Sequence, residues 1–548
     1  MPPMLPVPSS RFLVPAPGPG ARRAAPDAGP VDGRVPYAAT RRDPLAMRLS
    51  PCRQFPAGPG NDYVESPSHG DERPQDGWRI MRSPLRRAPR GGLDHDGAPE
   101  RGKAPEHAGR PPRAPGGRPL LGHVKPLLTD PLGLLASLPR HGEVVELRFG
   151  RTPTYVVCSP EAAQRVLRNS DHAFDKGGVF YENMRSIVGD GMATCPLAKH
   201  KRLRRLAQPA FQSGRMTGYA RTIQAQVDAV TATWRHGQVL DVLPEMRSLA
   251  TRSNLATMFC RRDLGPEVAG LRQSVTDFVD HQTILRMIAP GLNRLPTGRN
   301  RRYRASEARL LRFLDEEIAA YRKDGKDHGD LMSMFTTALD SDRLSDKEVR
   351  DTAMTVLLGG ITATAVGHAW ALHQLSQDSA LDAEVADEAQ AVAQLGQEHT
   401  AAEVMARLPR TRGVVAEVLR RRSPSYIFPR VTVTDTTIGS RRIPAGAQVL
   451  LSPYVLHHRP DLFPSPEDFD PYRWDGRDPH QVKGWLPFGA GESKCIAYEL
   501  AFMDLTLSLA GIVRSWRMHP CPGSVRPRPR LHLEPHGLTL RLTERNPR

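Results

Sequence analysis

The stretch that decides the fold is Pro487-Phe-Gly-Ala-Gly-Glu-Ser-Lys-Cys-Ile-Ala497. A glycine-rich turn delivers Cys495 to the start of a long amphipathic helix, which we expect over residues 495–516. Free backbone N–H groups and the helix dipole favour an anion at such a place, so the thiolate is the expected form of the cysteine. The glycines let the loop pass close to a flat partner, and Phe488 can cover the sulfur.

A single thiolate, with no second cysteine or histidine close to it in sequence, suits an axial iron ligand better than a zinc cage. The alternative is a buried cysteine in the first turn of a helix, which is the commoner fate of a lone cysteine. The six cysteines form no C-x-x-C pair and no ladder. Their scatter argues against a disulfide framework and favours a reducing, cytoplasmic location.

Two further motifs precede the cysteine loop. Glu417-Val-Leu-Arg420 lies in a helical segment and places opposite charges three residues apart on one face. Phe469-Asp-Pro-Tyr-Arg-Trp474 follows, and Cys495 comes 21 residues after it. Each motif alone occurs by chance, but all three in this order are much more specific.

The remaining pattern predicts a mainly α protein with a smaller β region (α+β). Two β-rich runs, 143–149 and 154–158, predict a hairpin. Residues 159–422 are mostly helical in periodicity, and β-type runs return after residue 423. We expect a single catalytic domain over residues 116–548.

Residues 1–115 form a separate compositional block, because 24 of the 52 prolines precede Leu120. With so few apolar residues in periodic register, the block cannot offset the entropy of ordering, and we expect a disordered extension. A tether or docking arm is one interpretation. We favour the other, which is that translation starts later, for example at Met81.

The chain of 548 residues has a formal net charge of +17, of which +7 lies before Leu120 and +10 after it. This spread indicates a mild preference for acidic partners and does not predict a nucleic-acid-binding tract. There is no run of 18 apolar residues and no signal-peptide pattern at the N-terminus. Neither a membrane span nor secretion is therefore expected.

Taken together, these motifs resemble the cytochrome P-450 family over about residues 115–542. The resemblance implies that family's fold, with haem b (iron protoporphyrin IX) between a long kinked distal helix and a proximal cysteine loop. It implies that Cys495 is the axial thiolate ligand and that Phe488 lies at the haem. It also implies a buried charge triad that braces the loop, formed by Glu417, Arg420 and Arg473.

The resemblance further implies contacts to the haem propionates. His200 and Arg204 match the contacts from one helix of the family, and Arg430 matches the arginine in the strand after the Glu-x-x-Arg helix. Alternatively, residues 200–205 are a solvated basic helix face or a docking surface for the reductant. The family has a basic residue two positions before the cysteine, where this chain has Ser493, so one propionate contact should be weaker.

A capping box, Ser345-Asp-Lys-Glu348, predicts the start of a helix that runs to about residue 376. Gly359 and Gly360 lie in its middle, where each costs roughly 1 kcal/mol relative to alanine. The family has a widened, kinked turn over the iron at this place. Close packing of two helices is the alternative reason for the glycines.

The same helix departs from the family at the residues that relay protons to dioxygen. An acid followed by a threonine is expected, but the alignment places Thr362 at the acid and Ala363 at the alcohol, with Thr364 next. Protons would then come from Thr362 or Thr364 through ordered water, or from a substrate hydroxyl.

Several framework stretches resemble bacterial terpene hydroxylases of the pentalenene oxygenase type, among them residues 119–123, 442–446 and 451–458. An apolar pocket, which suits a hydrocarbon held by shape, is expected from a set of residues on three segments. They are Phe180, Gly359, Gly360, Ile427 and Phe428.

The resemblance thus implies a monooxygenase that inserts one oxygen atom of O2 into a C–H bond of a hydrophobic molecule, such as a sesquiterpene-type terpene. No flavin or nicotinamide fingerprint occurs, so a separate ferredoxin and ferredoxin reductase would supply electrons to a cytoplasmic monomer. Two alternatives stay open. One is desaturation, ring closure or coupling by the same fold. The other is a degenerate haem-binding or partner-binding homologue, which the changes at Thr362, Ala363 and Ser493 motivate.

Overall fold

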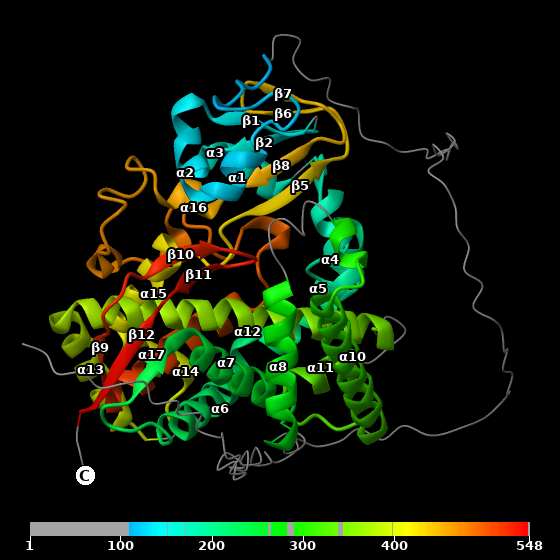
Figure 1. Cartoon of the computed structure of the whole chain (residues 1–548). Helices are drawn as coiled ribbons and strands as arrows, with labels where there is room; N and C mark the ends of the chain where they lie inside the picture. Colours follow the sequence, from blue (N-terminus) through cyan, green and yellow to red (C-terminus); the bar gives the residue numbers. More distant parts are fainter. Residues whose placement is uncertain are drawn as a thin grey trace, which may run out of the picture. The chain divides into compact units, whose positions relative to one another are not determined.

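A long helix, α12 (Asp346–Gln377), lies at the centre of the described structure (Figure 1). The computed structural model describes residues 109–545, apart from 151, 170, 261–264, 282–289, 338–343 and 397. The capping box expected from the sequence begins α12, because the Ser345 hydroxyl accepts from the N–H of Glu348 and the Glu348 carboxylate accepts from that of Ser345. The helix is α-helical at every residue, Gly359 and Gly360 included, so no widened turn is part of its secondary structure.

Most of the other helices precede α12 in the chain. They are α1 (Val124–Thr129), α2 (Pro131–Ser137), α3 (Pro160–Arg168), α4 (Gly178–Val188), α5 (Leu197–Ala207), α6 (Ser213–Thr231), α7 (Val242–Met258), α8 (Gly265–His281), α10 (Gly298–Asp324) and α11 (Leu331–Thr337). After α12 come α13 (Ser379–Ala393), α14 (Ala401–Ala406), α15 (Pro409–Arg421), α16 (Pro453–His457) and α17 (Tyr498–Ser515).

The largest core cluster forms where α7, α10 and α17 pack against α12. Trp370 of α12 is 2% exposed, and its indole N–H donates to the carbonyl of Leu533 at 2.8 Å. Among the described residues, α12 is the one helix long and apolar enough to cross a membrane. Since 72% of its most apolar window is buried, it serves as a core helix.

The main sheet has five strands in the order β1-β2-β8-β5-β3. Their bounds are β1 (Val144–Phe149), β2 (Thr152–Val157), β8 (Gln448–Leu451), β5 (Phe428–Thr432) and β3 (Phe174–Asp175). Strands β1 and β2 form the hairpin predicted from the sequence, with Val145 opposite Val156. Strand β8 lies parallel to β2 and antiparallel to β5, so the sheet joins segments from distant parts of the chain.

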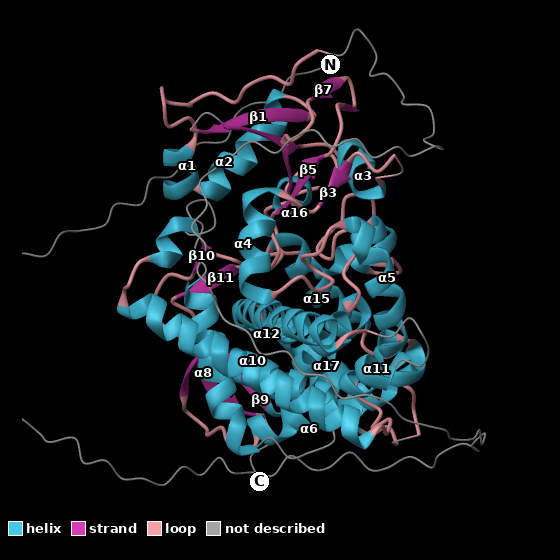
Figure 2. Ribbon diagram, turned by 90° about the vertical axis from the view of Figure 1, so that its right-hand side faces the viewer, coloured by secondary structure: helices cyan, strands magenta, loops and turns pink. Residues whose placement is uncertain are grey.

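The other strands form small sheets. They are β6 (Thr436–Ile438) with β7 (Arg441–Ile443), β4 (Val239–Asp241) with β12 (Thr539–Glu544) and β9 (Trp516–Pro520), and β10 (Arg526–Pro529) with β11 (Leu533–His536). The β10–β11 hairpin lies against α12 (Figure 1). Helices predominate and strands are few (Figure 2), as expected for the α+β class.

Two expected boundaries are wrong. The helix after the cysteine begins at Tyr498, so Cys495 lies in the preceding loop. Residues 109–115, assigned to the disordered extension, are ordered. Ala114 is 4% exposed, and its N–H donates to the backbone carbonyl of Glu146 in β1 at 2.9 Å. The reason is that β1 is an edge strand whose free backbone groups accept a partner segment. The rest of the expected extension, residues 1–108, lies outside the described residues.

Candidate functional site

The cysteine loop holds Cys495 in a defined backbone conformation. Its N–H donates to the carbonyl of Phe488 at 2.8 Å, and the backbone N–H of Ala497 hydrogen-bonds its sulfur. The side chain is solvent-accessible, yet burial among protein atoms raises the pKa of the thiol, while Ala497 and the charges of Arg204 and Lys494 lower it. The sulfur is therefore held among protein groups and is still reachable from solvent.

The buried carboxylate of Glu417, on the Glu-x-x-Arg helix α15, ties this helix to the segment 470–474 that precedes the cysteine loop. Both Glu417 oxygens accept from Arg420, at 2.8 and 2.9 Å. Arg473 Nε donates to the same carboxylate at 3.2 Å and Trp474 Nε1 at 3.0 Å. The structure therefore brings together the three residues of the expected triad and adds Trp474, which the sequence reasoning missed.

A second connection, through His457, was also missed. Its Nε2 accepts from the N–H of Leu486, at the start of the cysteine loop, at 2.8 Å. Its Nδ1 therefore carries the proton and donates to the carbonyl of Arg420, also at 2.8 Å. Burial lowers the pKa of His457 to about 3, so the imidazole is neutral and can make both bonds. The only sequence signal was its place in the framework stretch 451–458.

Four basic side chains gather near the loop on α5, β5 and the segment before α4. Two of these, His200 and Arg430, are 4% and 5% exposed, and Arg204 is partly buried and donates to the carbonyl of Lys494. The fourth, Lys176, is 4% exposed, and its ammonium donates to the carbonyl of Met192 at 2.8 Å. Lys176 was not foreseen, because nothing local distinguishes it from a surface lysine.

Burial and the neighbouring positive charges disfavour the protonated forms of Lys176 and His200. Burial, together with the charges of Arg430 and Arg204, lowers the pKa of Lys176 to about 7. Burial and the other three cations lower the pKa of His200 to about 3. Among the residues that the structure describes, no carboxylate forms an ion pair with any of the four. The cluster is thus a buried site with unmatched positive charge.

One face of α12 also borders open space. Gly359 is exposed and Ala363 partly exposed in a helix whose other faces are buried, and a Cβ added at Gly359 would meet nothing within 4 Å. A Cβ at Gly360 would instead lie 2.2 Å from Nδ2 of Asn254 on α7. Gly359 therefore faces open space, whereas Gly360 allows two helices to pack closely.

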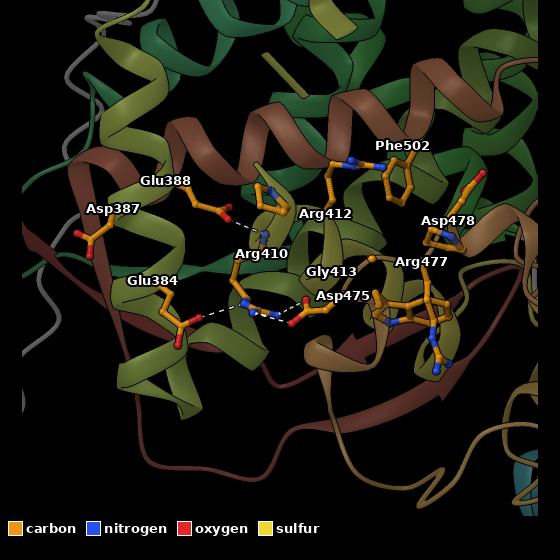
Figure 3. Close-up of a pocket in the computed structure, with 14 residues that line it drawn as sticks. Glu384, Asp387, Glu388, Arg410, Arg412, Gly413, Asp475, Arg477, Asp478 and Phe502 are labelled. Atoms are coloured by element: carbon orange, nitrogen blue, oxygen red, sulfur yellow. Dashed lines mark hydrogen bonds and ion pairs between the residues drawn. The ribbon is translucent and has the colours of Figure 1, made fainter. Parts of the chain in front are cut away.

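A groove elsewhere has a different character. It lies between α13, α15 and the segment after Trp474, and its lining is mostly charged (Figure 3). Arg410 pairs with Glu384 at 3.0 Å and with Asp475 at 2.9 Å. Since these charges already satisfy one another, we assign the groove no apolar ligand.

A family model described as cytochrome P450 matches residues 112–541. The chain belongs to the cytochrome P450 family. A solved cytochrome P450, the crystal structure of the P450DA heme domain, is similar to it in fold, with a TM-score of 0.71 and 25% sequence identity. That match covers 80% of this chain and 99% of the other.

Relatives with similar sequences come from Streptomyces. Cyclooctatin synthase of Streptomyces melanosporofaciens is 38% identical, over 77% of this chain and 93% of the relative. Cyclooctat-9-en-7-ol 5-monooxygenase of the same organism is 37% identical, over 75% and 90%. Pentalenene oxygenase of Streptomyces avermitilis is 34% identical, over 79% and 97%.

The site residues fit the haem of a cytochrome P450. Haem carries two propionate carboxylates. The unmatched cations Lys176, Arg204 and Arg430 would neutralise them, and the neutral ring of His200 would donate a hydrogen bond to them. Cys495 is a reachable lone donor, and no group of three or more His, Cys, Asp or Glu within the described range could hold a bare metal ion. The chemistry of these donors therefore suits a flat, anionic metal complex that needs one protein ligand.

The remaining predicted residues lie in four places. Phe180 packs edge-on against Tyr181 with ring centroids 5.3 Å apart, and Ile427 and Phe428 are partly buried at the start of β5. Phe488 packs among aromatic rings, including that of Trp485, with centroids 6.0 Å apart. On α12, Thr364 is buried, with 5% exposure. Thr362 is bonded to His532, a residue that the sequence reasoning missed.

Proposed function

We propose that this cytochrome P450 binds haem b through the thiolate of Cys495 and inserts one oxygen atom of O2 into a C–H bond of a cyclic terpene. The observation that carries the proposal is the cysteine loop, which presents an accessible sulfur beside a buried and unmatched cationic cluster. The substrate class follows from three relatives whose names describe terpene oxidation or synthesis.

Haem supplies oxygen activation when bound, and a thiolate ligand favours cleavage of the O–O bond. The chain's own residues prepare the site for this chemistry. The N–H of Ala497 and the charge of Arg204 favour the anionic form of Cys495. The cationic cluster would hold the propionates, and Gly359 leaves room for a flat or bulky hydrocarbon beside α12.

The framework around the loop keeps the sulfur in place. Arg420 is fully buried and bonds to Glu417 and to the carbonyls of His457 and Asp468, at 2.8 and 3.1 Å for the carbonyls. His457 in turn holds Leu486. Because these bonds link α15 to Leu486 at the start of the loop, they help to pre-organise the thiolate before haem binds.

Cytochromes P450 take electrons from redox partners, and for this chain we propose a ferredoxin with a ferredoxin reductase. The net charge of +17 and the exposed Lys201 on α5, close in sequence to the cationic cluster, suit an acidic ferredoxin. We further propose that the enzyme is a cytoplasmic monomer and that residues 1–108 are not needed for catalysis.

The first test is the carbon monoxide difference spectrum of the reduced protein. We expect a Soret band at the wavelength that names the family, loss of that band in Cys495→Ser, and its retention in the matched control Cys521→Ser, whose thiol is only partly exposed. A thiolate band that survives Cys495→Ser contradicts the ligand assignment. Far-UV circular dichroism shows whether both variants fold.

The second test is product analysis with cyclic terpenes and a reconstituted ferredoxin chain. A hydroxylated terpene supports the proposal. Desaturated, cyclised or coupled products would support a different reaction of the same fold, which the missing acid and the alanine at position 363 favour. Substrate binding without any product would favour the non-catalytic alternative.

A further inference from the structure

The hydroxyl of Thr362 connects α12 to the C-terminal hairpin. Its Oγ1 lies 2.8 Å from the carbonyl of Leu358 and 2.7 Å from Nε2 of His532, in the turn before β11. Both side chains are buried, Thr362 at 4% and His532 at 8% exposure. A hydroxyl has one proton, so when that proton bonds to Leu358, Nε2 must donate to Oγ1.

Thr362 stands at the edge of the open face of α12. An α-helix turns by about 100° per residue. The side chain of Thr362 therefore projects about 60° from the direction that a Cβ at Gly359 would take, and about 100° from the side chain of Ala363. Gly360 projects to the opposite side, against α7. The pair of Thr362 and His532 is therefore next to this open face, at the helix position where other cytochromes P450 have an acid.

His532 is isolated from the charges around it. Burial lowers its pKa to about 4; the carbonyl of Pro424 raises it and the charge of Arg247 lowers it. Arg247 is already paired with Glu534 at 2.6 Å. Arg530, which lies 3.9 Å from Glu534, is paired with Asp280 at 2.6 Å. The imidazole is thus neutral at pH 7, and its Nδ1 makes no hydrogen bond to any described residue.

We propose that His532 is a positioning residue that acts through Thr362: it holds a proton at Nε2 against Oγ1 and so sets the direction of the hydroxyl beside the open face of α12. In this role the pair replaces the acid that α12 lacks. The inference rests on the proposed oxygenation, in which a correctly oriented donor beside the oxygen site is needed for efficient use of electrons.

A spectroscopic test uses the full chain labelled with 15N in its histidine rings, with the His532 signals assigned by their loss in His532→Gln. We expect a neutral ring protonated at Nε2, which does not titrate between pH 5 and pH 8 and whose Nε2 signal moves in Thr362→Val. A ring that titrates near its ordinary value, or one that does not respond to Thr362→Val, overturns the proposal.

A functional test measures product formed per electron pair consumed, with peroxide as the uncoupled product. We expect His532→Leu and Thr362→Val each to lower this ratio by up to about tenfold, the loss expected for one hydrogen bond. The double variant should be no worse than either single variant, because the two residues act as a unit. His532→Gln and Thr362→Ser, which keep polar atoms at these positions, should recover part of the ratio.

The matched control is His536→Gln, which changes an exposed histidine of the same hairpin. This variant should form as much product per electron pair as the wild type. The proposal is overturned if His532→Leu forms as much product per electron pair as the wild type. It is also overturned if the reductions of this ratio in the two single variants multiply in the double variant. If His532→Leu does not fold, His532→Gln and Thr362→Val carry the test. If the wild type forms no oxygenated product, the proposed function fails, and the ring spectrum still decides whether the pair exists.

Discussion

Arg430 donates a hydrogen bond of 2.7 Å from Nη2 to the hydroxyl of Ser493. This bond joins strand β5 to the loop two residues before Cys495, where other cytochromes P450 carry a basic side chain. Arg430 also donates to the hydroxyl of Tyr181 at 3.0 Å, so neutral oxygens hold its guanidinium. Ser493 therefore orients a strand cation and supplies no charge of its own.

Substitutions at Ser493 should change haem retention in opposite directions. Ser493→Ala removes one hydrogen bond of Arg430, worth about 1 kcal/mol, and should speed haem loss about fivefold. Ser493→Arg adds a cation for the propionates and should slow haem loss, while repulsion from Arg430 destabilises the haem-free protein. Transfer of haem to apomyoglobin measures the rates, and the exposed Ser213→Ala is the control. Equal rates in both Ser493 variants would argue against a propionate site here.

Acid should weaken the support of the cysteine loop through His457. Its pKa is about 3 in the folded protein and near 6.5 when unfolded, so only the unfolded chain gains a proton between these values. The contribution of His457 is complete above pH 6.5 and falls as pH decreases. The expected loss is roughly 2 to 3 kcal/mol between pH 6.5 and pH 4.5.

Urea unfolding at several pH values measures this loss. His457→Gln should be less stable than the wild type at pH 7.5 and should show a shallower dependence on pH. The exposed His236→Gln should keep the wild-type dependence. An unchanged slope in His457→Gln would mean that other groups cause the acid sensitivity.

Lys176 should destabilise the haem-free protein and stabilise bound haem. Its pKa is lowered to about 7 from an unfolded value of 10.5, so the haem-free protein should gain stability as pH rises between these values. Lys176→Met removes the cost of burying the charge, on the order of 4 kcal/mol at pH 7. We expect a higher melting temperature without haem and weaker haem binding by titration. Weaker haem binding without a gain in haem-free stability would contradict an unmatched charge at this position.

The two adjacent glycines of α12 should respond differently to alanine. Gly359→Ala adds a methyl group into open space and improves helix propensity, for a gain of up to about 1 kcal/mol. Gly360→Ala places a methyl group against Asn254 and should cost roughly 1 to 3 kcal/mol. Thermal unfolding compares them, and Gly359→Ala alone should weaken the spectral shift caused by a bulky terpene. Equal stability changes would refute the assigned helix orientation.

Local patterns in the sequence were enough to predict several elements correctly. The capping box at Ser345 starts α12, the β1–β2 hairpin forms between two β-rich runs, and Glu417 pairs with Arg420 one turn away. Each depends on residues a few positions apart, whose hydrogen bonds and spacing follow from the backbone geometry of one element. The motif around Cys495 could also be recognised from the sequence, because its glycines and cysteine lie within a few residues of one another.

Tertiary structure alone decided the partners of these elements. Lys176 joins the cationic cluster, His457 links Arg420 to Leu486, and His532 reaches Thr362 from 170 positions away. In the sequence these are ordinary lysine and histidine residues. Their roles arise because packing removes them from water, which makes a neutral imidazole or an unmatched charge depend on groups from distant segments. Likewise, only the rotation of α12 against α7 separates Gly359, which faces open space, from Gly360, at the helix contact.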